Sequence, residues 1–272
     1  MAFQYLQVER DGSVVQCTFV NPPMNFMNGR MVAELDVLAR EVAASKDDRV
    51  LMFTGGVDGI FITHYDVSEL SRAADSGASG GYDGGRETEG QSAIDFIHTV
   101  FNRIQSLPKV TIAALNGTAM GGGCELSLAC DFRVMADGPY RIGLPETSVG
   151  IIPGAGGTQR LARLLGKAKA LDLILHGRVV EPQEALTLGL VHRLFPVDGF
   201  RASAASFARE LAGRAPIALA AAKRAIHAGL DTDLESGLAI ERAEFAKTMN
   251  SVDARGAMRA YLKGEPYTFK GE

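Results

Sequence analysis

The sequence predicts an α/β protein, because stretches with the period of a strand alternate with stretches at helical spacing in its first half. Residues 13–19 alternate as a β-strand does, and the apolar residues within 31–42 recur at the spacing of one helix face. Residues 49–54 and 109–115 are short apolar runs that each end in a glycine-containing turn. Such runs indicate buried strands, and α/β proteins usually place their sites at the ends of these strands.

Composition limits the classes of partner. The chain has 272 residues, of which 46% are hydrophobic, so it can bury one sizeable core. Its formal net charge of -4, without a long Lys/Arg run, argues against nucleic acid as a partner. Residues 1–12 contain charges and no apolar stretch, so we expect no signal peptide, no membrane-spanning helix and a cytoplasmic location. Cys17, Cys124 and Cys130 lack paired spacing and lie among apolar residues, which predicts buried thiols rather than a disulfide or metal site.

The chain divides into a main domain, residues 1–199, and a C-terminal region, residues 200–272. The second region is helical throughout, with apolar residues repeating at helical spacing from Phe200 onward. Residues 71–93 are rich in Gly and Ser and poor in large apolar residues, so burial cannot offset the entropy lost on ordering them. We predict a mobile loop there, either a lid or a plain surface insertion.

Residues 116–131, NGTAMGGGCELSLACD, join the end of a strand to a glycine run and an apolar helix. A helix that begins near Gly122 presents backbone amides without intrahelical partners, and these suit an oxygen that becomes negative during a reaction. Glu125 lies in the first turn of this helix. Its position fits a catalytic carboxylate and fits equally well a carboxylate that only stabilises the helix N-terminus.

Residues 143–160, GLPETSVGIIPGAGGTQR, place Glu146 before an apolar turn and a second glycine cluster that opens a helix. A P-loop needs Lys-Ser/Thr after its last glycine, whereas Thr158-Gln159 follows here. No GxGxxG sequence follows a predicted strand, and no GxSxG elbow, which joins a strand to a helix, occurs. The sequence therefore argues against a nucleotide-triphosphate site, a dinucleotide site and a serine hydrolase.

These two segments together resemble the enoyl-CoA hydratase/isomerase (crotonase) family, whose pattern runs from NG-x-A-x-GGG-x-E-L to PE-x(3)-G-x-x-PG-x-GG-T-Q-R-L. The order, spacing and residue types match closely. The similarity continues along nearly the whole chain, at Asn21-Pro22, Leu51, Thr54-Gly55, Phe61, Asp66, Gly177-Arg178, Glu184-Ala185 and 188–191.

The resemblance implies a spiral of ββα units followed by C-terminal helices that mediate a trimer, often a dimer of trimers. It implies an acyl-CoA thioester as substrate and no metal or other cofactor. In the family, two backbone amides hold the thioester oxygen, and the matching positions are Tyr65 and Gly122. Gly154 matches a position whose amide helps to place the catalytic water. Both acidic positions of the hydratase pattern are filled, and we assign Glu125 to the water and Glu146 to the C2 proton.

The chain departs from the family at His64-Tyr65, where small residues are usual. A tyrosine at this position keeps its backbone N–H donor. We expect Tyr65 to pack outside the pocket and His64 to be exposed. The alternative is that the Tyr65 ring narrows the acyl channel. The turn around Met24 lacks the basic residue that many relatives carry near the coenzyme. Met24, Asp66 and Lys263 are the candidate coenzyme contacts, and Lys263 would act across a subunit boundary.

The sequence favours an enoyl-CoA hydratase, and two alternatives remain. An enoyl-CoA isomerase would shift the double bond with one carboxylate and no water. A CoA- or RNA-binding scaffold would keep the fold without the chemistry, and intact Glu125 and Glu146 argue against it. The other histidines, His98 among them, show no ligand spacing and are interpreted as structural.

Overall fold

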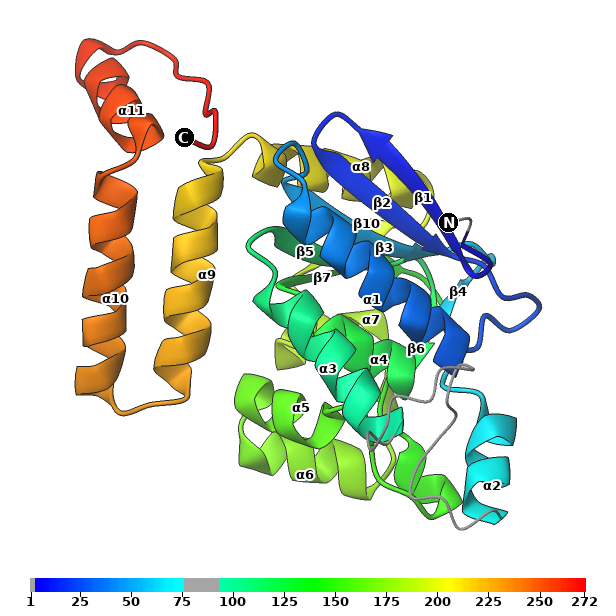
Figure 1. Ribbon diagram of the computed structural model, residues 1–272. Coiled ribbons are helices and arrows are strands. Elements are labelled where there is room, and N and C mark those ends of the chain that lie inside the picture. Colours follow the sequence, from blue (N-terminus) through cyan, green and yellow to red (C-terminus); the bar gives the residue numbers. More distant parts are fainter. Residues whose placement is uncertain (1–2, 76–92) are drawn as a thin grey trace.

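The computed structural model describes residues 3–75 and 93–272, which form two β-sheets with helices around them (Figure 1). The larger sheet has the strand order β1-β2-β3-β5-β7-β10 and the smaller the order β4-β6-β8-β9. The strands of the larger sheet are Leu6–Asp11 (β1), Val14–Phe19 (β2), Val50–Gly55 (β3), Val110–Leu115 (β5), Phe132–Asp137 (β7) and Arg193–Pro196 (β10). Those of the smaller sheet are Ile60–Ile62 (β4), Thr118–Met120 (β6), Ile142–Gly143 (β8) and Val179–Val180 (β9).

Successive strands alternate between the two sheets. β3, β5 and β7 are parallel neighbours in the larger sheet, and β4, β6 and β8, which follow them in the chain, are parallel neighbours in the smaller one. Helical segments follow each pair, so the predicted α/β class and spiral of ββα units are confirmed. These segments are Val67–Asp75 (α2), Ala93–Ser106 (α3), Gly122–Leu128 (α4), Glu146–Val149 (η1), Gly157–Leu165 (α5) and Lys167–Leu175 (α6).

Where the chain crosses from the larger sheet to the smaller one, its backbone segments lie in very close contact. A Cβ added to Gly117 would lie 1.9 Å from the carbonyl carbon of Gly59, so no larger residue fits there without a shift of the backbone. The Oδ1 atom of Asn116 accepts a hydrogen bond from the Gly55 N–H at 2.7 Å and thereby joins the ends of β3 and β5. The glycine turns predicted after these strands are thus the points where the two sheets meet.

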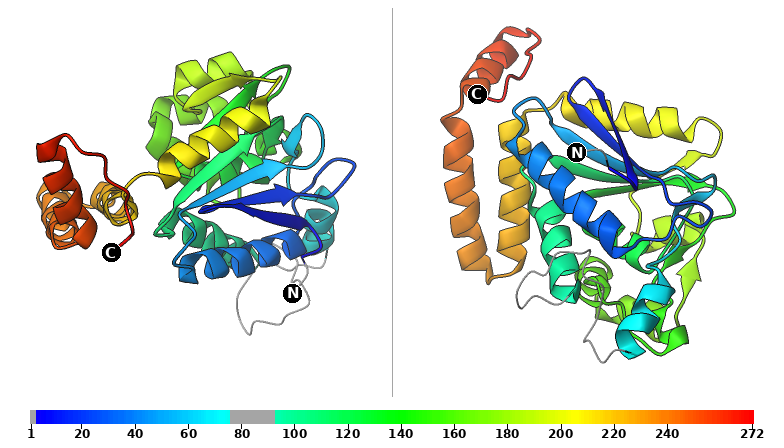
Figure 2. Two further views of the ribbon diagram at one scale, coloured as in Figure 1. Left: turned by 90° about the horizontal axis from the view of Figure 1, so that it is seen from above. Right: turned by 45° about the vertical axis from the view of Figure 1, so that its right-hand side comes forward.

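Both faces of the larger sheet are covered, which explains the continuous apolar strands. Leu51 and Phe53 of β3 belong to the cluster on the side of Gly29–Ala44 (α1) and α3, whereas Val50 and Met52 face Phe200–Ala212 (α8). In Figure 2, α1 and α8 lie on opposite sides of this sheet. α8 falls within the region 200–272 of the sequence but packs directly on the sheet through Phe200, Ala204 and Phe207.

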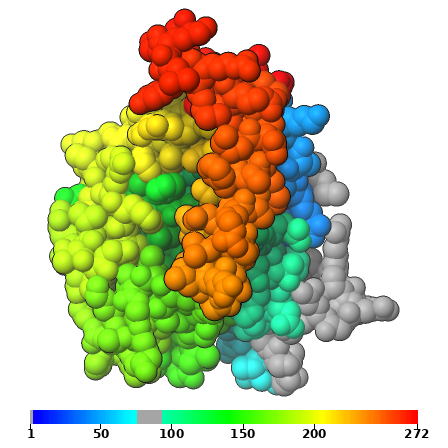
Figure 3. Space-filling model, turned by 90° about the vertical axis from the view of Figure 1, so that its left-hand side faces the viewer, coloured from blue at the N-terminus to red at the C-terminus, as the bar shows by residue number. Residues whose placement is uncertain are grey.

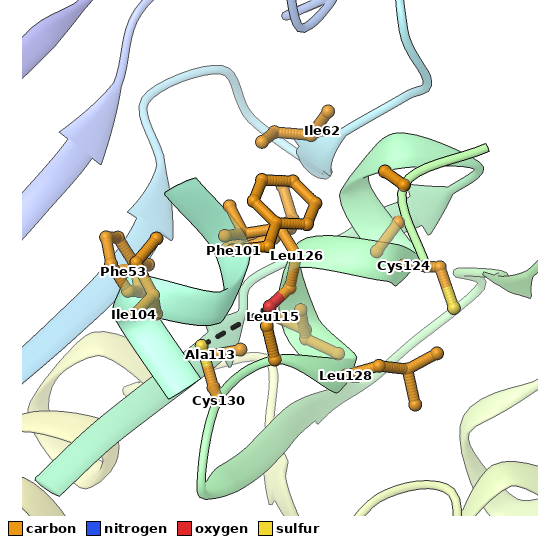
Figure 4. Packing of buried hydrophobic residues seen from close by; sticks show 14 of the residues in the cluster. Phe53, Ile62, Phe101, Ile104, Ala113, Leu115, Cys124, Leu126, Leu128 and Cys130 are labelled. Carbon is orange, nitrogen blue, oxygen red and sulfur yellow. Dashed lines mark hydrogen bonds between the residues drawn. The ribbon is translucent and has the colours of Figure 1, made fainter. Parts of the chain in front are cut away.

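α4 is buried along its whole length and carries the first glycine-rich segment into the core. Figure 4 shows Leu126 of α4 with Phe101 of α3 and Ile62 of β4, all in the cluster beneath the sheet. Cys17, Cys124 and Cys130 are buried free thiols, as predicted. The apolar side chains of α4 therefore fix the orientation of the one carboxylate in its first turn.

The last helices form a C-terminal arm, residues 216–263, that projects from one side of the body (Figures 1 and 2). It consists of Pro216–Leu230 (α9), Leu234–Met249 (α10) and Val252–Lys263 (α11). The remaining helix of the body, Pro182–Leu188 (α7), precedes β10. Within one chain, the buried residues of the arm are few: Ala220, Ala221, Glu244, Asp253 and Ala260.

The loop predicted at 71–93 lies largely outside the described residues. At its two ends the prediction was wrong, since residues 71–75 belong to α2 and residue 93 begins α3. None of the helices in the described ranges has the length and apolar character needed to cross a membrane. The cytoplasmic location stays a prediction.

Candidate active site

Glu125 points from the first turn of α4 into a pocket of backbone amides. Its side chain is buried, with the residue 3% exposed. Its Oε1 atom accepts hydrogen bonds from the Ala155 N–H at 2.7 Å and from the Gly157 N–H at 2.9 Å. Both donors belong to the turn of residues 153–157 that opens α5. The two glycine-rich segments of the sequence thus meet at one carboxylate oxygen.

Glu146 begins η1, three residues after β8 ends. The Gly121 N–H donates to the Gly143 carbonyl oxygen at 3.0 Å, which brings the connection after β8 against the start of α4. A Cβ added to Gly121 would lie 3.3 Å from Glu146 Oε1. Gly121 also has φ +49, a backbone conformation that favours glycine. The carboxylate of Glu146 therefore lies beside the glycine run that leads to Glu125.

One oxygen of Glu146 lacks a hydrogen-bond partner among residues 3–75 and 93–272. Its Oε2 atom is buried and, among the residues described by the structure, accepts or donates no hydrogen bond. Buried polar atoms normally have partners, so an exception marks a place where something else supplies the contact. A bound substrate is one such partner, and a carboxylic acid needs a free oxygen to deliver its proton.

Both glutamates hold their protons more tightly than usual. Burial raises the pKa of Glu125 to about 7, and the negative charge of Glu146 adds to this, while the amides of Gly157 and Ala155 and the charge of Arg160 oppose it. Burial raises the pKa of Glu146 to about 7 as well. Two such neighbours can share one proton near neutral pH, which leaves one as a base and the other as an acid.

Tyr65 and Gly122 bring two backbone positions together next to these carboxylates. Tyr65 forms a parallel bridge with Met27, flanked by the bonds Met27 N–H to His64 O (3.0 Å) and Asp66 N–H to Met27 O (2.7 Å). A Cβ added to Gly122 would lie 3.6 Å from the Tyr65 nitrogen. The predicted oxyanion positions are thus neighbours, although they are 57 residues apart in the sequence.

The Tyr65 side chain lies against the body of the protein. Its hydroxyl group donates to Glu69 Oε2 at 2.9 Å, and the same oxygen accepts the Gly29 N–H at 3.1 Å. The Glu69 carboxylate therefore links the Tyr65 hydroxyl to the start of α1, and the Tyr65 ring packs on the main core. His64 is half-buried rather than exposed, because its ring packs on Phe26 with centroids 4.6 Å apart. The prediction that His64 is exposed was wrong.

Gly154 lies in the same turn as the two amides that bind Glu125. Its carbonyl oxygen is 2.8 Å from Nε2 of His98, a residue of α3 that sequence reasoning had treated as structural. Arg160 was likewise missed: its Nη1 donates to the Ala155 carbonyl at 3.0 Å. Arg160 belongs to the quoted GGTQR segment, so its position was visible in the sequence, whereas nothing near His98 signals its contact.

The candidate coenzyme contacts do not all meet in one chain. Met24 is 40% exposed beside the cis Pro22-Pro23 turn. Asp66 accepts the Ser68 N–H at 2.8 Å, so its carboxylate caps α2. Lys263 is exposed at the end of α11, on the opposite side of the molecule from α2 in Figure 1. Within one chain, the end of α11 with Lys263 therefore lies apart from the other two.

Comparison with known proteins shows the family of the chain. The family model for enoyl-CoA hydratase/isomerase matches residues 9–272. The short-chain-enoyl-CoA hydratase of Clostridium acetobutylicum is 32% identical over 94% of this chain and 94% of its own length. The mitochondrial methylglutaconyl-CoA hydratase of Rattus norvegicus is 38% identical over 88% of this chain and 74% of its own.

The solved structure of an enoyl-CoA hydratase from Bacillus anthracis superposes with a TM-score of 0.88 at 34% identity, covering 99% of this chain and all of the other. Sequence and fold thus agree over essentially the full length. The chain belongs to the enoyl-CoA hydratase/isomerase family.

Proposed function

We propose that this protein is an enoyl-CoA hydratase, which adds water across the 2,3 double bond of an enoyl-CoA thioester to give a 3-hydroxyacyl-CoA. The observation that carries the proposal is the pair of neighbouring glutamates, Glu125 buried and Glu146 half-buried, each with a pKa of about 7, beside the backbone of Tyr65 and Gly122. An isomerase needs one proton-transferring carboxylate, whereas hydration uses two.

In the proposed reaction, the thioester oxygen accepts hydrogen bonds from the backbone amides of Tyr65 and Gly122. Negative charge that develops on this oxygen is stabilised there, which activates C3 towards water. The ionised Glu125 accepts a proton from the water as its oxygen bonds to C3, and the amide of Gly154 helps to place that water. Protonated Glu146 delivers its proton to C2. The pair then exchanges a proton to return to its starting state, so no metal or redox cofactor is required.

The coenzyme end of the substrate would extend past Met24 and Asp66, with Lys263 of a neighbouring subunit near the phosphates. This arrangement requires the trimer or dimer of trimers expected from the family. It is supported by the position of α11, which ends at Lys263 and lies on the opposite side of the molecule from α2 (Figure 1). Large apolar side chains are also exposed on the arm, including Leu230 at 77% and Leu234 at 78%.

Substitution of the two glutamates tests the mechanism. Glu125→Gln and Glu146→Gln are nearly isosteric, so assembly and CoA binding should survive while hydration falls by about two to four orders of magnitude, the usual contribution of positioned proton transfer. The double variant should be little worse than either single one, because residues that act as a unit are not additive. Wild-type hydration rates in both single variants would refute the mechanism.

The substrate panel should contain short, medium and aromatic enoyl-CoAs, with products resolved by mass and position of the double bond. If the protein is an isomerase, the double bond should move while the product does not gain the mass of water. One of the two glutamine variants should then keep nearly the wild-type rate of double-bond migration. A binding scaffold would retain CoA affinity and turn over no member of the panel.

A further inference from the structure

The hydrogen bond that Ala155 donates to Glu125 is controlled from the other side of the same peptide group. The Ala155 N–H and the Gly154 carbonyl belong to one planar unit, so fixing the carbonyl fixes the direction of the N–H. This carbonyl lies 2.8 Å from His98 Nε2, and the N–H lies 2.7 Å from Glu125 Oε1. A single rigid plane therefore connects the imidazole of α3 to the carboxylate of α4.

The chemistry of the contact decides which atom carries the hydrogen. A carbonyl oxygen only accepts hydrogen bonds, so Nε2 of His98 must be the donor. The resulting chain runs from His98 Nε2–H to Gly154 C=O, and from Ala155 N–H to Glu125. Hydrogen bonds linked through a peptide group polarise one another, which makes the Ala155 N–H a better donor to a negative charge.

Behind the second amide on Glu125, the part of the chain that the structure describes places no comparable side chain. The Gly157 N–H shares its peptide plane with the Gly156 carbonyl, which accepts the Arg160 N–H at 2.9 Å within the first turn of α5. That amide is therefore fixed by the helix itself. α3 also touches the turn through Ile94, whose Cδ1 would lie 3.3 Å from a Cβ on Gly154. Of these contacts, His98 is the polar one that acts on the Ala155 amide.

We propose that His98 is a positioning residue for Glu125: it orients and polarises the Gly154–Ala155 peptide so that the carboxylate is held, in its ionised form, where water is activated. The kinetic consequence rests on the function proposed above. The charged groups that face Glu125 are Glu146 and Arg160. Arg160 is held by Gln105 at 2.7 Å and Asn102 at 2.6 Å, and none of these groups contacts the imidazole in the bonds described here.

Three substitutions separate this role from packing. In His98→Gln, the amide nitrogen reaches the position of Nε2 and can donate to the Gly154 carbonyl. His98→Asn is polar but too short, and His98→Leu fills the space without a donor. His176→Leu removes a histidine from the far end of α6, where its partner is Asp172, and serves as a matched control.

The first measurement is the titration of Glu125 in the free protein by infrared difference spectroscopy, with its band assigned by its loss in Glu125→Gln. Losing a donor destabilises the charged form, so His98→Asn and His98→Leu should raise the pKa of Glu125 by roughly 0.5 to 1. His98→Gln and His176→Leu should leave it unchanged. An unchanged titration in both His98→Asn and His98→Leu would overturn the proposal.

The second measurement is the rate of hydration. His98→Asn and His98→Leu should lower kcat about three- to tenfold with a smaller effect on KM, and His98→Gln should restore it. In a Glu125→Gln background, the same changes at position 98 should be nearly silent, because the group that they position is gone. If the wild-type protein adds no water but the Glu125 titration still follows position 98, the proposed function fails while the positioning role stands. Equal losses of kcat in all three His98 variants would show that His98 contributes only packing.

Discussion

Glu125 and Glu146 are carboxylates that the folded protein disfavours in their charged form. Burial raises the pKa of each from 4.5 to about 7, so between these values the folded state binds more protons at these positions than the unfolded chain does. Protons bound preferentially by the folded state stabilise it, and this stabilisation is lost as the pH rises through 7. At alkaline pH the two carboxylates therefore lower the free energy of unfolding.

Removing the charge should consequently stabilise the protein. At pH 8, Glu125→Gln should raise the free energy of unfolding by up to about 3 kcal/mol, the amount equivalent to this rise in pKa. The glutamine oxygen can still accept from Ala155 and Gly157, so no donor is left unpaired. The difference should fall to about 1 kcal/mol or less at pH 5 and nearly vanish at pH 4, below the unfolded pKa of 4.5. Denaturant titrations of both proteins at equal concentration measure this, and a variant that is less stable at pH 8 would contradict it.

The turn of residues 153–157 is the element on which the geometry of Glu125 depends. A Cβ on Gly157 would lie 2.9 Å from Glu125 Oε1 and 2.8 Å from the Pro153 Cβ, so it fits only if the turn moves. Gly157→Ala should thus lower hydration by about two orders of magnitude, since shifts of 1 Å at a catalytic group have effects of that size. Helix α5 itself should tolerate alanine.

A glycine that ends another helix supplies the control for this substitution. At Gly213, an added Cβ would meet its nearest atoms at 3.5 and 3.6 Å, which is ordinary contact. Gly213→Ala should leave hydration unchanged. Steady-state kinetics and circular dichroism of both variants test the comparison, and full activity in Gly157→Ala would show that the turn does not need to hold its position.

Sequence reasoning located the elements of the site better than the contacts between them. The start of a helix at Gly122 was predicted and is confirmed, because a glycine run followed by apolar residues is a local signal. The meeting of Glu125 with a turn 30 residues later is not local, and no spacing reveals it. His98 was missed for the same reason, since its partner lies 56 residues away.

At the scale of the whole molecule, the C-terminal arm exposes large apolar side chains, which subunit interfaces usually bury. Phe245 is 64% exposed and Tyr261 84%, and α10, in orange, faces the viewer in front of the body in Figure 3. The sequence predicted this region as helical from the apolar repeats. It did not reveal that α8 belongs with the sheet, because the periodicity of a helix shows that one face is covered and not what covers it.

We expect a trimer or hexamer in solution that depends on the arm. Replacing Leu234 and Phe245 together with glutamate should shift the protein to monomers, because charges placed in an apolar interface are costly to desolvate. Val197→Glu, an exposed apolar position at 44% outside the arm, should leave assembly intact. Light scattering at micromolar concentration distinguishes these results, and a monomeric wild-type protein would contradict the expectation.

The alternation of successive strands between two sheets also affects how the sequence of such a protein can evolve. Glu125 follows β6 and Glu146 follows β8, so the two groups proposed to transfer protons are carried by separate connections rather than by the strands. A replacement in one connection alters one group while the pairing of every strand and the other group persist. We therefore expect that evolution can replace one of the two carboxylates at a time, without a variant along the way that fails to fold.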